Sequence, residues 1–136
     1  MVADAPIPRQ AGHRLRIVVS LAGLVVALLV FSIGIDRIPV TDRDEARFAQ
    51  ASKQMALSGD FVDIRFQDRP RYKKPVGIYW AQSAASKAVG QPGTNEIWVY
   101  RLPSVLAAAV ACVILVWTGT PIVGWSASIV AAVMLA

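Results

Sequence analysis

The sequence has little of the chemistry that metal sites and disulfides need. It contains one cysteine and one histidine. Cys112 has no partner for a disulfide, and it lies in an apolar run, where a lone thiol is usually a small packing residue. His13 stands among N-terminal basic residues, so no zinc-binding set is recognisable. Glycine-rich phosphate loops, a G-x-S-x-G motif and fixed-period repeats are also absent. This pattern excludes the standard soluble nucleotide-binding sites, and nothing in it predicts a nucleic acid partner.

Charge is also scarce, and the apolar residues form long blocks. Charged residues make up 17% of the chain and hydrophobic residues 55%. A bilayer core of roughly 30 Å needs about 20 helical apolar residues. We therefore predict transmembrane helices at 17–35 and 102–118, and the start of a third at 121–136. Because the third run is still apolar at Ala136, we interpret the chain as the N-terminal fragment of a longer protein.

The first apolar run has a rival interpretation as a secretory signal peptide. A cleavable apolar segment is shorter, about 7 to 15 residues, and is followed by a small-x-small exit. The segment from Gly34 to Pro39 has no such exit, which favours a membrane span. The tail at 1–16 carries three arginines near this span and only Asp4 to oppose them. This bias predicts a cytoplasmic N-terminus and places the loop at 36–101 outside.

The first part of this loop predicts an amphipathic helix at about 43–58. Asp42 can cap the helix, and Glu45 three residues later can complete a capping box. Apolar residues then form one side of the helix up to Gly59, a typical C-terminal stop.

The second part of the loop predicts a short strand, a turn and a further helix. Residues 61–66 alternate as in a strand, and residues 67–72 are typical of a turn. A second helix at about 75–89 follows, and its Tyr79 and Trp80 suit a membrane–water interface. The fold class is therefore an all-α polytopic membrane protein with two surface helices in a long first external loop.

Charged groups of both signs gather in this loop. Acidic residues lie close to the outer end of the first span, and a basic stretch follows about 30 residues later. They are Asp42, Asp44 and Glu45, then Arg69, Arg71, Lys73 and Lys74. Such carboxylates can act as general bases, and such cations can bind a lipid phosphate. The same residues can equally cap a helix and hold anionic head groups, so residue types alone leave both interpretations open.

The order of short motifs resembles the N-terminal region of GT-C glycosyltransferases of the protein O-mannosyltransferase and aminoarabinose (lipid A) transferase type. The motifs are Asp44-Glu45-Ala46-Arg47-Phe48, Ser58-Gly59-Asp60-Phe61, Tyr72-Lys73-Lys74-Pro75 with Ile78-Tyr79-Trp80, and Tyr100-Arg101-Leu102-Pro103-Ser104. The resemblance implies a many-span enzyme of the bacterial inner membrane, with its first loop periplasmic and part of the active site. It implies a polyprenyl-phosphate-linked sugar as donor, membrane lipids as neighbours, and a lipid, glycan or protein as acceptor. The fragment alone would be inactive.

The resemblance also assigns roles to residues. Asp44 and Glu45 match the family's acidic motif, with Asp44 as the catalytic carboxylate. Lys74 matches the residue that meets the carrier phosphate, and we assign Arg71 and Arg47 to the same phosphate site. Arg47 can also pair with Asp44 one helical turn away. Many aminoarabinose transferases have a metal-binding Glu before the Lys-Pro pair, but Lys73 stands there in this chain, which argues against a metal.

Two other classes of function remain open from the sequence. A lipid or lipid-linked-sugar transporter (flippase) could use the basic loop to gather lipid phosphates without transferring a sugar. A non-catalytic membrane subunit could use the loop to bind a partner. Loss of Asp44 would not matter to a transporter unless that residue carried protons.

Overall fold

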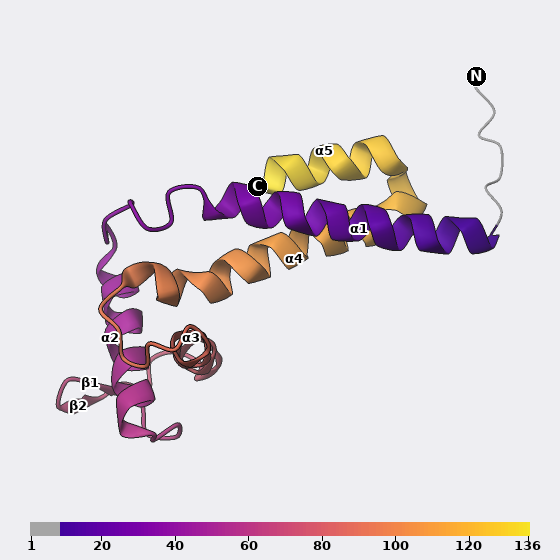
Figure 1. The fold of residues 1–136 in the computed structure, drawn as a ribbon. Coiled ribbons are helices and arrows are strands. Elements are labelled where there is room, and N and C mark those ends of the chain that lie inside the picture. The colour runs from indigo at the N-terminus through magenta and orange to yellow at the C-terminus, as the bar shows by residue number, and fades with distance from the viewer. Residues whose placement is uncertain (1–8) are drawn as a thin grey trace. The chain divides into compact units, whose positions relative to one another are not determined.

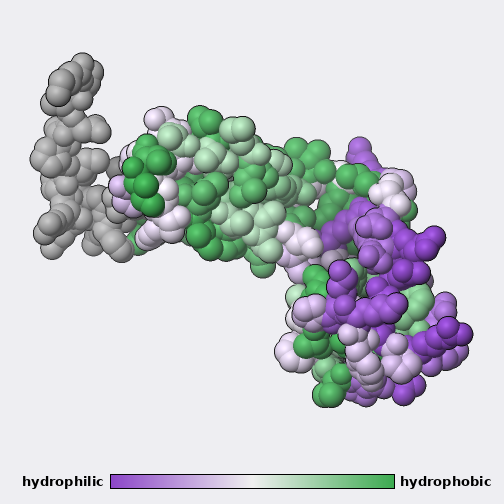
Figure 2. All heavy atoms as spheres, turned by 180° about the vertical axis from the view of Figure 1, so that it is seen from behind, coloured by the Kyte–Doolittle hydropathy of each residue, from purple (hydrophilic) through white to green (hydrophobic). Residues whose placement is uncertain are grey.

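The computed structural model of the chain describes residues 9–136, which form two compact units. One unit contains helix α1 and the segment Ala107–Ala136, and the other, the loop unit, is Ser32–Leu106. The elements in chain order are α1 (Arg9–Ser32), α2 (Arg43–Ser58), β1 (Arg65–Phe66), β2 (Arg69–Pro70), α3 (Gly77–Ala88), α4 (Ile97–Val123) and α5 (Trp125–Leu135) (Figure 1). On the face shown in Figure 2, hydrophobic residues predominate over the described part of the first unit, and hydrophilic residues gather over the loop unit.

Helix α4 is the one helix in the described part of the chain that is long and apolar enough to cross a membrane. Its 27 residues span about 40 Å, which exceeds a bilayer core of roughly 30 Å. It begins five residues before the predicted span at 102–118 and ends five after it. The apolar helices at Ile17–Ser32 and Trp125–Leu135 are shorter, so their crossing of a membrane stays a prediction.

The apolar unit differs from the expected boundaries at both ends. Helix α1 begins at Arg9, so residues 9–16 of the expected tail are helical, and residues 1–8 lie outside the described residues. It ends at Ser32, and Gly34 follows with a φ of +74° in a turn, whereas the span was expected to reach residue 35. Helix α5 begins after Gly124, whose φ of +86° interrupts the helical backbone.

In the loop unit, helix α2 has local signals at both ends. The Asp42 carboxylate accepts a hydrogen bond of 3.0 Å from the backbone N–H of Asp44. Gly59 ends the helix at a φ of +73°, a conformation that favours glycine. The expected capping box does not form, because the Glu45 carboxylate accepts hydrogen bonds from Arg101 instead.

The core of the loop unit lies between α2, α3 and the segment before β1. Ala51 and Met55 of α2 pack with Ile64 and Tyr79, and all four side chains are buried. Tyr79 is fully buried, so its expected place at a membrane–water interface is wrong. Its ring lies in the core because it stands on the face of α3 that packs against α2.

Buried polar side chains add specific contacts between α2 and α3. The Ser52 hydroxyl donates to the Gln82 amide oxygen at 2.7 Å, and the Ser83 hydroxyl donates to the Ser52 carbonyl at 2.9 Å. Gln82 also donates to the carbonyl of Tyr100 at 3.0 Å, which ties the start of α4 to α3. Small serines let the two helices approach closely, and the hydrogen bonds remove the desolvation cost of burying them.

The strand expected at 61–66 is much shorter in the structure. Strand β1 pairs with β2 in antiparallel fashion, with Arg65 opposite Pro70 and Phe66 opposite Arg69. The alternation before Arg65 does not make a strand, because the Asp60 carboxylate accepts from the backbone N–H groups of Val62 and Asp63 and holds the chain in a turn.

Candidate functional site

The start of α2 lines a pocket of about 310 Å³ in the loop unit. Its lining combines carboxylates with aromatic and amide side chains from three helices. The lining residues are Asp42, Asp44, Glu45, Phe48, Ile78, Gln82, Tyr100, Arg101 and Ser104. Small-molecule sites typically pair an apolar wall with a few polar groups of this kind. The pocket is therefore the candidate functional site.

Asp44 is an exposed carboxylate of this pocket that lies near two arginine side chains. Its side chain is 51% exposed. One of its oxygens lies 3.6 Å from a guanidinium nitrogen of Arg47 and 3.9 Å from one of Arg71. Its carboxylate is therefore open to a ligand and lies near two positive charges.

Arg71 reaches this carboxylate from the interior of the loop unit. Its side chain is only 12% exposed, and its guanidinium carbon lies 5.7 Å from the centre of the Phe48 ring and 5.8 Å from that of Phe66. Its Nε donates to the hydroxyl of the buried Tyr79 at 3.3 Å. The sequence places Arg71 in a predicted phosphate site, whereas the structure encloses it among aromatic rings.

Glu45 has a different environment from its neighbour. Its two carboxylate oxygens accept hydrogen bonds of 2.5 and 3.2 Å from Arg101. The same guanidinium donates to the backbone carbonyls of Ile35, Ile38 and Pro39. All five N–H groups of the guanidinium are thus used, and both Glu45 oxygens are occupied. Asp44 is therefore the more accessible of the two carboxylates.

Arg101 is a residue of the site for which the sequence predicts no role, although it stands within one of the motifs. It lies 56 positions from Glu45, so no helical or strand spacing links the two. The one available signal was a charged residue at the edge of an apolar run, since such residues are usually paired. Arg101 joins the start of α4 to the start of α2 and to the chain before it.

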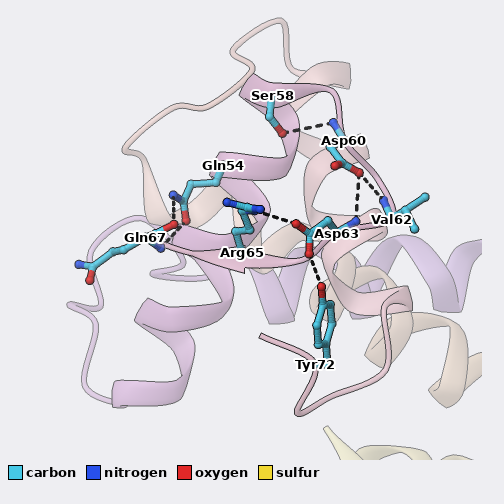
Figure 3. Close-up of polar contacts among 8 residues, drawn as sticks. All are labelled: Gln54, Ser58, Asp60, Val62, Asp63, Arg65, Gln67 and Tyr72. Carbon is cyan, nitrogen blue, oxygen red and sulfur yellow. Dashed lines mark hydrogen bonds and ion pairs between the residues drawn. The ribbon is translucent and has the colours of Figure 1, made fainter. Parts of the chain in front are cut away.

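Lys74 lies on an exposed segment and does not line the pocket. The start of this segment is fixed by Asp63, whose carboxylate accepts from the Tyr72 hydroxyl and, at 2.7 Å, from Arg65 (Figure 3). The hydrogen bond from Tyr72, followed by that from Arg65, lowers the pKa of Asp63 below its ordinary value. The contacts hold the segment before Lys73 and Lys74 against the turn made by Asp60 (Figure 3).

The acidic residues of the pocket do not fit a divalent cation. Both Glu45 oxygens are engaged by Arg101, and two arginines already face Asp44. Among residues 17–136, whose side chains the structure describes, no group of three or more His, Cys, Asp or Glu side chains is placed to hold a metal ion. The described residues that line this pocket therefore do not by themselves form a metal site.

Comparison with known proteins gives one kind of match. The chain is similar to the undecaprenyl phosphate-alpha-4-amino-4-deoxy-L-arabinose arabinosyl transferase of Aeromonas salmonicida, at 30% identity over 90 residues. This match covers 66% of the chain and 16% of the relative. The protein of the same name from Yersinia pestis is 29% identical over 98 residues, which cover 68% of the chain and 17% of that relative.

The chain thus spans about a sixth of the length of the curated relatives it matches. No family model matches the chain, and no solved structure matches it significantly. The relatives are glycosyltransferases by name, which agrees at a coarse level with the family resemblance found in the sequence. The names of these relatives assign no role to single residues.

Proposed function

We propose that the full-length protein is a GT-C type glycosyltransferase that moves a sugar from a polyprenyl-phosphate carrier to an acceptor at the outer face of a membrane. The observation that carries this proposal is the half-exposed Asp44 at the mouth of a pocket, with Arg47 and Arg71 beside it. The similarity to arabinosyl transferases that use undecaprenyl phosphate supports the donor class.

The chemistry assigns a different task to each side chain. For an acceptor hydroxyl, Asp44 would take the proton while the oxygen bonds to the anomeric carbon. The bond from that carbon to the phosphate oxygen would break, and the polyprenyl phosphate would leave with the electron pair. Lys74 would stabilise the charge that builds on this phosphate. For a phosphate acceptor no deprotonation is needed, and Asp44 would orient the acceptor instead.

The proposal includes an orientation in the membrane. The arginines of the tail at 1–16 favour a cytoplasmic N-terminus, so the loop unit with its pocket would be external, in a bacterial inner membrane. A cysteine introduced at the exposed Ser58 should react with an impermeant thiol reagent added outside. Reaction from the cytoplasmic side alone would reverse the orientation.

The decisive experiment is transfer of labelled sugar from polyprenyl-phosphate donors by membranes that contain the full-length protein with Asp44→Asn. This change keeps the size of the side chain and removes its charge and basicity. Turnover should fall by roughly 10²- to 10⁴-fold, the usual scale of general-base catalysis, with normal expression.

Asp42→Asn is the matched control, because Asp42 caps α2 and asparagine also caps well. It should cost at most about 1 kcal/mol of stability. Because Asp42 also lines the pocket, the comparison is one of size, and its effect on transfer should be far smaller than that of Asp44→Asn. Parental transfer by a well-expressed Asp44→Asn protein would refute the role of Asp44.

A further inference from the structure

Arg71, a largely buried arginine, contacts the pocket residue Asp44, and its surroundings differ from those of its sequence neighbours. Arg71 belongs to a run with Lys73 and Lys74, which are exposed, but its own side chain is 12% exposed. A phosphate ligand must present its N–H groups to the carrier. The Arg71 guanidinium instead lies near the faces of two phenylalanine rings and donates to a buried tyrosine.

The contacts of Arg71 leave one terminal nitrogen of its guanidinium near the carboxylate of the pocket residue Asp44. The rings of Phe48 and Phe66 lie within 6 Å of the guanidinium carbon, and the Tyr79 hydroxyl accepts from Nε. A terminal nitrogen then lies 3.9 Å from the Asp44 carboxylate. Partly desolvated cation–π contacts fix a guanidinium more strongly than exposed ones. The guanidinium is thus held in place by neighbours that come from α2, β1 and α3.

From this geometry we infer that Arg71 is a positioning residue for Asp44, and not a ligand of the donor phosphate. The inference rests on the proposed function, because it concerns the orientation of the same carboxylate. Other charged groups also surround this carboxylate: Arg47 from the same helix, Asp42 and Glu45 at its start, and Arg101 from α4. Arg101 is neutralised by Glu45, and Arg47 is more exposed, so Arg71 is the least exposed cation of the group.

The test is the steady-state kinetics of labelled sugar transfer by full-length protein with Arg71→Met, which keeps the volume of the side chain and removes its charge. A positioning residue acts through Asp44, so kcat should fall about 10-fold or more, while the KM for the polyprenyl-phosphate donor changes less than about 3-fold. The matched control is Arg43→Met, since Arg43 is exposed, adjoins Asp44 in sequence and does not line the pocket. Its kcat and KM should equal those of the parent.

Arg71→Lys keeps a cation between the rings and covers the case in which Arg71→Met does not accumulate. It should retain donor KM and lose part of kcat, because lysine has no planar fork for Tyr79 and Asp44 together. A rise in donor KM at parental kcat, in either variant, would make Arg71 a phosphate ligand and overturn the inference. Parental values of both constants would overturn it too.

Asp44→Asn, assayed beside these variants, separates the two proposals. Loss of transfer in Asp44→Asn together with parental kinetics in the Arg71 variants would refute the positioning role alone. Parental transfer in Asp44→Asn would refute the role of Asp44 and the positioning role with it, whereas absence of transfer by the parent protein would refute the proposed function itself. Where residual transfer by Asp44→Asn is measurable, Arg71→Met in that background should lower it less than about 2-fold, because the group it positions is already gone.

Discussion

Each of the two units of the chain has its own kind of internal contact. In the apolar unit, small residues bring helices close: a Cβ atom added at Gly119 of α4 would lie 2.8 Å from the Ser128 hydroxyl oxygen of α5. In the loop unit, an arginine joins distant segments, and buried serines and Gln82 bridge the helices. Helices in lipid gain no hydrophobic drive from one another and depend on close packing. The comparison indicates that charged and polar contacts position the segments of the loop unit, where the chemistry is proposed. Close packing of small residues positions the helices of the apolar unit.

The largest expected effect is on the loop unit, through Arg101→Ala. This change leaves Glu45 and the carbonyls of Ile35 and Ile38 without their donor. Breaking a largely desolvated pair in this way should destabilise the protein by about 3 kcal/mol. The midpoint of thermal unfolding in detergent measures it. Arg101→Lys should recover little, because three donors on one nitrogen cannot reach the same acceptors. Full stability of Arg101→Ala would show that charge does not set positions here.

The next effect separates two lysines of the loop unit. Lys74→Ala should lower kcat/KM for the donor by about 10-fold or more, as expected for loss of a charge-assisted contact to a phosphate whose charge grows as it leaves. Lys87→Ala is the control, since Lys87 lies over the Phe61 ring, with its Nζ 4.4 Å from the ring centre, at the end of α3. Transfer assays at varied donor concentration would measure both. Equal effects would reduce the role of Lys74 to general surface charge.

A smaller effect is expected in the apolar unit from Gly119→Ala. The new methyl group would meet the Ser128 side chain, so that side chain or the helices must shift, at a cost of about 1 to 3 kcal/mol. Ser128→Ala in the same protein removes the contacting oxygen and should restore part of the loss. Thermal unfolding of the two variants checks this prediction. No loss in Gly119→Ala would mean that shape is less decisive in this unit than the comparison suggests.

The smallest effect is a pH dependence of the loop unit. Hydrogen bonds from Tyr72 and Arg65 lower the pKa of Asp63, and the backbone N–H groups of Asp63 and Val62 lower the pKa of Asp60. Because the folded pKa values lie below the unfolded value of about 3.9, this stabilisation is present above that value. It is lost as the pH falls through the folded pKa. Unfolding midpoints between about pH 6 and pH 3 measure it. Tyr72→Phe should weaken the dependence, and an unchanged slope would contradict the assignment.

Local features of the loop were predictable because they depend on near neighbours in sequence. Asp42 caps the helix whose first turn it precedes, and Gly59 ends it in the left-handed region. The burial of Tyr79 and the pairing of Glu45 with Arg101 were not predictable, because both depend on segments brought together only by folding. The short length of β1 was missed because the alternation at 61–66 is typical of a strand, whereas the Asp60 carboxylate binds the same backbone groups.

The candidate site was predictable in part for the same reason. The acidic motif lies at the start of α2, where its residues are neighbours in sequence and in space, and the Asp44–Arg47 contact is a helical-turn spacing. Arg71 is enclosed by aromatic rings on α2 and β1. Its distance from those rings in the sequence does not predict that they meet. A basic run therefore looked uniform in sequence although its members have different surroundings.

The serine-lined contact between α2 and α3 has a consequence for the medium in which the loop unit stays folded. Ser52, Gln82 and Ser83 join the helices by hydrogen bonds that need no surrounding water, and these bonds strengthen as the local dielectric constant falls. Apolar contacts, in contrast, draw their strength from the exclusion of bulk water. A pair of helices joined in this way tolerates the partly dehydrated zone of lipid head groups. A pair joined by leucines alone would lose much of its hydrophobic stabilisation there.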